Sequence, residues 1–166
     1  LRQMQAPIKA KYLDDPAAAL QTFQAIGKIS PGDLGCQIDT PFVSLNAGLH
    51  PAAGGSGKDA CSGDMLMEAL VACAGVTFNV VATAMGISFR SARVIAKGEA
   101  DFRGTLGTSK ETPVGITNVA MTFEIDSDAS DDVLEKLAKQ TERYCVILQT
   151  LKNPPSIVTH LNRTSS

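Results

Sequence analysis

The segment SGDMLMEALVACAGVTFNVVATAMG, residues 62–86, begins like a helix and continues as a long apolar run. Ser62 is a typical N-cap residue, and Asp64 lies in the first turn, where the helix dipole favours a negative charge. No charged residue occurs between positions 69 and 89. The segment therefore predicts a long central helix over about 63–86 that is buried on all sides.

The same segment has the length of a membrane span, because about 20 apolar residues cross a bilayer. Its composition favours a buried helix instead. The segment is rich in Ala, Gly and Thr, includes Asn79, and has few Leu, Ile or Phe residues to drive insertion. We therefore expect no membrane association.

Cys73 and Cys145 are the strongest candidates for residues with a chemical function. Cys73 lies in the middle of the predicted helix, and at about 100° per residue it shares a face with Leu66, Leu70, Val76, Thr77 and Val80. Cys145 starts a short helix, whose positive end lowers the pKa of a thiol. Two such thiols, far apart in sequence, suggest a redox pair assembled by the fold. The alternative is that each cysteine is a small buried hydrophobic residue.

The remaining segments predict a single α+β domain over residues 1–166. Asp15 as N-cap and Pro16 at the first helical position predict an N-terminal helix over about 16–26. Alternation of apolar and polar residues predicts a long antiparallel hairpin, and no linker divides the chain. The expected strands cover residues 35–38, 42–45, 94–103, 116–126 and 157–161, and the C-terminal helices cover about 131–152.

The composition of the chain argues against several classes of function. The chain has 15 Lys and Arg against 17 Asp and Glu residues, a net charge of −2, and so lacks the basic excess of a nucleic-acid-binding protein. Its four cysteines have no metal-binding spacing, so we expect no metal. Residues 54–59 are glycine-rich, but Asp59 follows Lys58 where a phosphate-binding loop needs Ser or Thr. The first 30 residues show no signal-like apolar segment, which predicts a cytoplasmic protein.

Two stretches carry a resemblance to a known family. CSGDMLMEALVACAG at residues 61–75 and ERYCVILQTL at residues 142–151 resemble the OsmC/Ohr family of thiol-dependent hydroperoxide reductases. The order of elements is also similar, over roughly residues 12–162. The resemblance implies an OsmC-like fold, in which an antiparallel sheet packs on the long central helix that carries the first cysteine. It also implies a homodimer, intertwined around paired central helices.

The resemblance further implies a peroxidase that serves oxidative stress defence, with Cys73 and Cys145 as its catalytic residues. Cys73 would be oxidised to a sulfenate by a hydroperoxide, and Cys145 would resolve the sulfenate as a disulfide. An external dithiol would then reduce the disulfide, without a bound cofactor. The alternative is a non-enzymatic OsmC-like protein that binds a small or lipid-like ligand in an apolar pocket at the dimer interface.

The sequence departs from the family's pattern at the groups that stabilise the thiolate. Hydroperoxide-reducing members resemble each other in an arginine upstream of the first cysteine, held by a glutamate ten residues before that cysteine. This chain has no arginine between Arg2 and Arg90, and Gly63 occupies the glutamate's position, with Asp64 displaced by one. This combination is similar to a divergent branch of the family. The possible thiolate-stabilising residues are Lys58, His50, Asp64 and Arg143.

The other two cysteines, Cys36 and Cys61, are interpreted as incidental. Cys61 precedes the central helix, and the helix between it and Cys73 measures about 18 Å, which is too long for a disulfide. Of the two, Cys61 is expected to be the more exposed.

Overall fold

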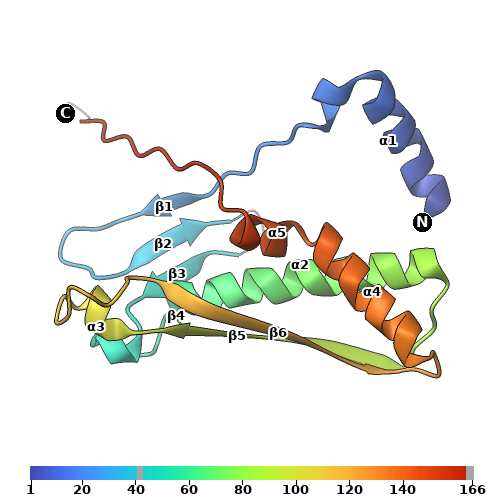
Figure 1. Ribbon diagram of the computed structural model, residues 1–166. Helices are drawn as coiled ribbons and strands as arrows, with labels where there is room; N and C mark the ends of the chain where they lie inside the picture. The colour runs from blue at the N-terminus through green and yellow to red at the C-terminus, as the bar shows by residue number, and fades with distance from the viewer. Residues whose placement is uncertain (41–42, 164–166) are drawn as a thin grey trace.

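The computed structural model describes residues 1–40 and 43–163, which form an α+β fold, as the sequence predicts (Figure 1). The helices are α1 (Arg2–Asp14), α2 (Ser62–Met85), α3 (Phe102–Thr105), α4 (Asp131–Tyr144) and α5 (Val146–Lys152). The strands are β1 (Ile26–Lys28), β2 (Cys36–Asp39), β3 (Leu45–Gly48), β4 (Ala60–Cys61), β5 (Ser91–Ala100) and β6 (Ile116–Asp126). Short 3₁₀ turns occupy Pro16–Ala19 and Pro51–Ala53.

The strands form two sheets. β1, β2, β3 and β4 make one sheet in that order, antiparallel except for the parallel pair β3–β4. β5 and β6 make a long antiparallel ribbon. The hairpin predicted over 94–103 and 116–126 is therefore confirmed, except that its first strand ends at Ala100 and residues 102–105 turn into α3.

The central helix predicted over 63–86 is confirmed as α2. Gly86 ends the helix with a φ of 69°, a left-handed conformation that glycine adopts without strain. The N-cap residue is Cys61 rather than Ser62, because β4 holds the backbone of Cys61 extended until the helix begins. Cys61 thus joins the four-stranded sheet directly to α2.

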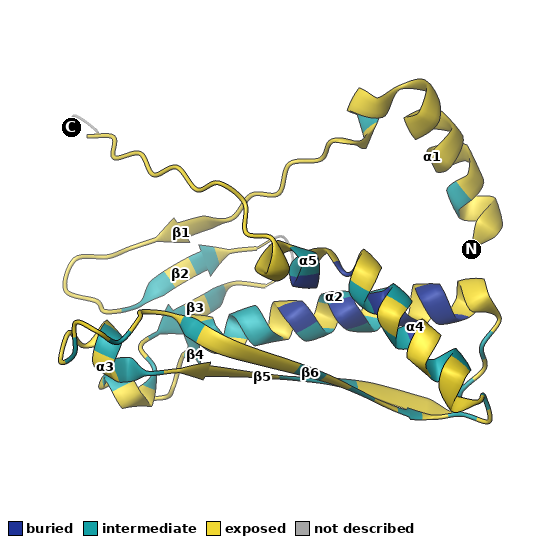
Figure 2. Cartoon of the chain, viewed as in Figure 1, coloured by how far each residue is buried: buried dark blue, intermediate teal, exposed yellow. Residues whose placement is uncertain are grey.

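The core lines one face of α2 along its length (Figure 2). Most of the residues that α2 contributes to the core follow one another at intervals of three or four positions, which is the spacing of one helical face. The first cluster is Leu70, Ala74, Cys145 and Leu148, and the second is Phe78, Val81, Ala82 and Leu137. The β5–β6 ribbon covers one side of this face, and α4 and α5 cover the other (Figure 1).

The expectation that α2 is buried on all sides is wrong for the single chain. Val76 is 66% exposed, Met85 40% and Val80 37%. One ribbon and two helices cover only part of the circumference of a helix that is apolar on several sides. By length and composition α2 could cross a membrane, but the core helix of a soluble protein passes the same test, and α2 packs against β5, α4 and α5.

The N-terminal helix predicted over 16–26 is wrong. Asp15 does cap the turn that follows, since its carboxylate accepts the N–H of Ala17 at 3.1 Å, but that turn ends at Ala19. Leu20 is 81% exposed and Phe23 is 90% exposed, so the predicted apolar face has no surface in this chain to pack against. The helix lies earlier instead, as α1, a segment in which no helix was predicted and which likewise has no buried residue.

Two predicted strands also differ from the structure. The strand expected over 42–45 begins only at Leu45, as β3, and residues 41–42 lie outside the described residues. The strand expected over 157–161 is absent from the described structure, where Ile157 is 84% exposed. This segment pairs with no strand of the described chain, although β1 and the β5–β6 ribbon have free edges.

Candidate active site

Cys73 lies in the middle of α2, on the side that faces the α4–α5 junction. Its side chain is half-buried and packs against the cluster of Leu70, Ala74, Cys145 and Leu148. Two cross-strand pairs of the β5–β6 ribbon, Val94 opposite Phe123 and Ala96 opposite Met121, pack against the same cluster. α2 thus holds the Cys73 thiol at the edge of a cluster that the ribbon also covers.

Cys145 lies at the junction between α4 and α5. Its N–H donates to the carbonyl of Thr141 at 2.9 Å, and its own carbonyl accepts the N–H of Gln149 at 2.9 Å, so it ends one helix and begins the next. Its backbone leaves the helical region there, with ψ at 106°. The thiol has no solvent exposure and packs in the cluster of Leu70 and Leu148.

The fold brings these two thiols together. Cys73 packs against the cluster that contains Cys145, and each of the two thiols shifts the pKa of the other. All four cysteines are free thiols in this structure. The two residues that the sequence and the family resemblance single out therefore form one site, built from α2 and from the α4–α5 junction.

The environment acts differently on the two thiols. Burial raises the pKa of Cys73, but hydrogen bonds from the backbone N–H groups of Ile147 and Val146 lower it. Hydrogen bonding with the Cys145 thiol and with the Thr77 hydroxyl lowers the pKa of Cys73 further. As a result, the pKa of Cys73 lies below the ordinary value of a thiol. The N–H groups at the start of a helix have no partner within the helix, which leaves them free to bind a thiolate.

Burial raises the pKa of Cys145, and the neighbouring Cys73 raises it further. A thiolate on Cys73 disfavours a second negative charge beside it. The backbone amides of Leu148 and Ile147 in α5 lower the pKa of Cys145, as expected for a helix start, but burial and the neighbouring Cys73 outweigh them. The amides of Ile147 and Val146 act on Cys73, the thiol on α2. The pair is polarised, because the pKa of Cys73 is lowered and the pKa of Cys145 is raised.

The four candidate thiolate-stabilising residues lie elsewhere in the described chain. His50 and Asp64 line a separate cavity of about 850 Å³ together with Cys61, at the start of α2. Lys58 is exposed in the preceding loop. Arg143 is exposed, with its guanidinium carbon 5.5 Å from the ring centre of Tyr144. The groups that lower the pKa of Cys73 are instead two backbone amides, a hydroxyl and the second thiol.

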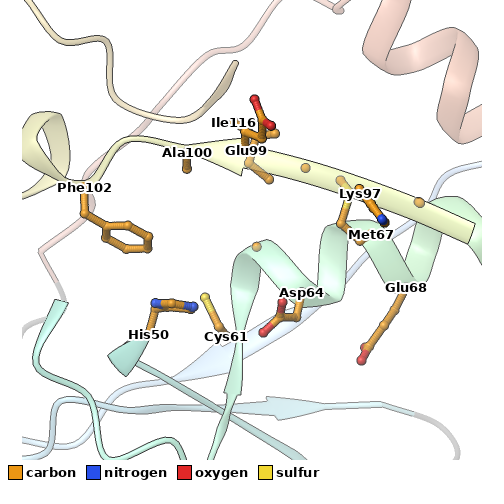
Figure 3. A pocket seen from close by; sticks show the side chains of 13 residues that line it. His50, Cys61, Asp64, Met67, Glu68, Lys97, Glu99, Ala100, Phe102 and Ile116 are labelled. Carbon is orange, nitrogen blue, oxygen red and sulfur yellow. The ribbon is translucent and has the colours of Figure 1, made fainter. Parts of the chain in front are cut away.

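The cavity beside Cys61 has its own contacts. Figure 3 shows His50, Cys61 and Phe102 pointing into it. The His50 ring stacks on Phe102 with a centroid distance of 4.8 Å, and its Nδ1 accepts the N–H of Ala52 at 3.0 Å. Cys61 is therefore placed in a pocket rather than on an open surface. Among the described residues, no group of three or more His, Cys, Asp or Glu side chains could hold a metal ion.

Cys36 and Cys61 lie on opposite faces of the four-stranded sheet. Cys36 pairs with Ala47, and Ala47 pairs with Ala60, so these three residues share one face. Cys61 follows Ala60 and points to the other face. Two strand spacings, about 9.5 Å, separate Cys36 from Ala60, which exceeds the reach of a disulfide. This pair cannot close without rearrangement of the sheet.

Sequence reasoning found the two thiols but missed the groups that polarise them. The amides of Val146 and Ile147 are backbone groups, which carry no residue signature. Thr77 does carry a signal, because it lies four residues after Cys73 on the same helical face.

The polarised pair predicts that the two thiols differ in reactivity. At pH 7.5, iodoacetamide should alkylate Cys73 first, because a lowered pKa gives a larger thiolate fraction below the ordinary value of about 8.5. Cys145 should react later and with an apparent pKa above that value. Peptide mass spectrometry over a pH series measures both rates, and a urea-unfolded sample supplies the control in which they become equal. Equal rates in the folded protein would contradict the assignment.

Comparisons with known proteins agree with this arrangement. The model of the family described as OsmC-like protein matches residues 55–160, more than half of the chain. An OsmC-like protein from Mycoplasma pneumoniae superposes with a TM-score of 0.66 at 16% identity, over 81% of this chain and 89% of that one. No curated protein matches.

Two further solved structures have the same fold. An organic hydroperoxide resistance protein OsmC from Legionella pneumophila gives a TM-score of 0.64 at 15% identity, over 81% of this chain and 93% of that one. An organic hydroperoxide resistance protein from Elizabethkingia anophelis gives 0.66 at 14% identity, over 81% and 91%. At these identities the likeness concerns the fold.

Proposed function

This chain belongs to the OsmC-like protein family, and from that premise we propose that it is a thiol-dependent peroxidase that reduces organic hydroperoxides. The observation that carries the proposal is the polarised pair. A thiol with a lowered pKa packs against the cluster that contains a buried thiol whose pKa is raised. That combination provides a nucleophile and a resolving group in one site.

The proposed first step oxidises Cys73. Its thiolate attacks the terminal oxygen of the hydroperoxide, an S–O bond forms, and the O–O bond breaks. The alcohol leaves as an alkoxide that takes up a proton, and Cys73 becomes a sulfenic acid. The apolar cluster against which Cys73 packs, which includes Leu70 and Leu148, suits the organic part of such a substrate.

The proposed second step uses Cys145. Its sulfur attacks the sulfenic sulfur, a disulfide forms, and the hydroxyl group leaves as water with the proton of the Cys145 thiol. A dithiol from solution then reduces the disulfide by two thiol–disulfide exchanges and is itself oxidised to a disulfide. The cycle needs one hydroperoxide and one dithiol per turnover, with no bound cofactor.

The absence of the family's arginine does not remove the chemical basis for this cycle. An arginine would stabilise the thiolate by its charge, whereas here the amides of Val146 and Ile147 lower the pKa of Cys73 by hydrogen bonding. The test is consumption of tert-butyl hydroperoxide by the reduced protein in excess dithiothreitol. We expect consumption of many equivalents per chain, and consumption at the rate of buffer alone would contradict the proposal.

A ligand-binding function is the second candidate, and the cavity of about 850 Å³ at the start of α2 favours it. Met67, Phe102 and Ile116 give this cavity an apolar part, and Cys73 does not line it. Binding of a fatty-acid probe there by a protein that leaves hydroperoxide unchanged would favour this second function. Cys73 and Cys145 would then serve only in packing.

We further propose an intertwined homodimer, in which a second copy of the chain covers the exposed side of α2. Val76 on that side is 66% exposed. The segments before β1 and after α5 also carry exposed apolar side chains. Those at least 75% exposed include Leu20, Phe23, Ile157, Val158 and Leu161. A strand of the partner would pair with the extended C-terminal segment, which pairs with no strand of the described single chain.

Sedimentation velocity at micromolar concentration tests the dimer. We expect a single species of twice the 17.4 kDa chain mass, because the exposed apolar surface is too large to remain in water. Val76→Asp should shift the distribution toward monomer, since it places a charge in the proposed interface. Thr122→Asp, on the exposed outer side of β6, is the matched control and should leave the dimer unchanged. A stable wild-type monomer would rule the dimer out.

A further inference from the structure

The cavity at the start of α2 contains a thiol that the proposed peroxidase cycle does not use. Cys61 lines this cavity of about 850 Å³ and is a free, half-buried thiol at the point where β4 becomes α2. It is the N-cap residue of α2, but within the described part of the chain its side chain makes no capping hydrogen bond. The Cys61 sulfur is therefore available to a molecule that enters the cavity.

Gly63 keeps the space beside this sulfur open. A Cβ atom at position 63 would lie 3.8 Å from Sγ of Cys61 and 3.9 Å from Cδ1 of Ile116, both ordinary contact distances. Any longer side chain at this position would thus start in contact with the sulfur. Because Gly63 has no side chain and itself lines the cavity, the sulfur stays uncovered on that side.

His50 is the second half-buried polar side chain of the cavity, and its neighbours fix both its orientation and its tautomer. The ring stacks on Phe102, and its Nδ1 accepts the N–H of Ala52 at 3.0 Å. A ring nitrogen that accepts a hydrogen bond carries no proton, so the proton of the neutral ring is on Nε2. Nε2 is at the outer edge of the ring, which points into the cavity (Figure 3), and His50 therefore offers a hydrogen-bond donor there rather than a base.

The rest of the half-buried lining is apolar. It includes the side chains of Met67, Phe102 and Ile116. The charged residues of the lining, among them Asp64 and Lys97, are exposed. A cavity of this size with apolar walls and few polar groups suits an uncharged small molecule that has an apolar chain and one hydrogen-bond acceptor.

We propose that Cys61 captures apolar α,β-unsaturated aldehydes and ketones in this cavity, and that His50 binds their carbonyl oxygen. The sulfur forms a bond to the β carbon, the C=C π electrons shift toward the carbonyl group, and the oxygen becomes an enolate that accepts the Nε2–H of His50. The α carbon then takes up the proton that the thiol has lost. S–H is thereby added across the double bond without an oxidant or a reductant. This capture uses neither Cys73 nor Cys145, so it is independent of the proposed peroxidase function.

Two aldehydes with the same reactive group test the role of the cavity. trans-2-Nonenal carries a six-carbon chain beyond its double bond, and crotonaldehyde carries one methyl group. We expect trans-2-nonenal to modify Cys61 of the reduced full chain at least about tenfold faster, because its chain can fill the apolar part of the cavity. Cys36 does not line this cavity and should react with the two aldehydes at similar rates. Peptide mass spectrometry, after borohydride reduction of the adducts, follows each cysteine.

Two substitutions of His50 separate its donor from its structural role. His50→Asn keeps an acceptor for the N–H of Ala52 but has no donor at the position of Nε2, whereas His50→Gln places an amide N–H near that position. We expect His50→Asn to slow the reaction of Cys61 with trans-2-nonenal about tenfold, the effect of losing one hydrogen bond to a developing charge. His50→Gln should stay within about threefold of the wild type. Iodoacetamide, whose reaction leaves no charge on its carbonyl oxygen, should alkylate Cys61 equally fast in all three proteins.

Several results would overturn the inference. They are equal rates of the two aldehydes at Cys61 in the folded wild type, an unchanged rate in His50→Asn, and an equal loss in His50→Asn and His50→Gln, which would leave His50 only its structural role. If circular dichroism shows that both His50 variants are unfolded, the comparison of the two aldehydes on wild-type protein decides. Cys61→Ser should form no adduct at position 61 and should consume tert-butyl hydroperoxide at the wild-type rate. Loss of hydroperoxide consumption in this variant would place Cys61 in the peroxidase cycle and contradict a separate site.

Discussion

Cys145→Ser is expected to change the protein from a catalyst with many turnovers into a reagent that consumes one equivalent of hydroperoxide per chain. Cys73 keeps its two backbone amides and Thr77 in this variant, so its oxidation to a sulfenic acid continues. The sulfenic acid then lacks the thiol that lies beside it in the native site. Cys73→Ser, by contrast, should lose even the first equivalent, because a serine hydroxyl at neutral pH does not attack a peroxide.

Two measurements check this pair of variants. A titration with tert-butyl hydroperoxide counts equivalents, and dimedone, which traps sulfenic acids, should label Cys73 in Cys145→Ser and not in the wild type. Cys36→Ser serves as the control, since Cys36 lies on β2 in another sheet and should leave turnover unchanged. Full turnover by Cys145→Ser would show that Cys145 is not the resolving thiol.

Leu137→Ala is expected to have the largest effect on stability. Leu137 has no solvent exposure and packs with Phe78 and Val81, where α4 crosses the central helix. Truncation of such a leucine leaves a cavity between two helices and should cost about 3 kcal/mol, within the range of about 2–5 kcal/mol for buried leucine. The loss should appear as a lower urea midpoint with an unchanged slope.

The matched control for this change is Leu13→Ala on α1. Leu13 is 85% exposed, so the same truncation there should alter the free energy of unfolding by less than about 0.5 kcal/mol. Both proteins must be compared at one protein concentration, because dimerisation adds to apparent stability. Equal losses in the two variants would contradict the description of the core.

The parts of the fold that sequence predicts well are those whose pattern is complete within one segment. The central helix has its start near Asp64 and its stop at Gly86, and the hairpin has regular alternation on both strands. The predictions for 16–26 and 157–161 failed because each pattern requires a surface from elsewhere. Apolar residues such as Phe23 show that a segment can be buried, but they do not show what buries it.

The candidate site divides in the same way. The spacing of residues identified Cys73 on an apolar helical face, and the family resemblance identified Cys145 as its partner. The groups that lower the pKa of Cys73 were not predicted, because the amides of Val146 and Ile147 acquire their role only when α5 packs against α2. Cationic side chains such as Arg143 were expected instead, since charge is visible in sequence and backbone direction is not.

The central claim is that Cys73 and Cys145 form one polarised redox pair, and disulfide mapping after oxidation tests it most directly. The reduced protein should be treated with one equivalent of tert-butyl hydroperoxide, blocked with N-ethylmaleimide, digested without reductant and analysed by mass spectrometry. We expect a peptide pair linked through Cys73 and Cys145, with Cys36 and Cys61 recovered as blocked thiols. A link between Cys36 and Cys61, or recovery of Cys73 as an unmodified thiol, would contradict the claim.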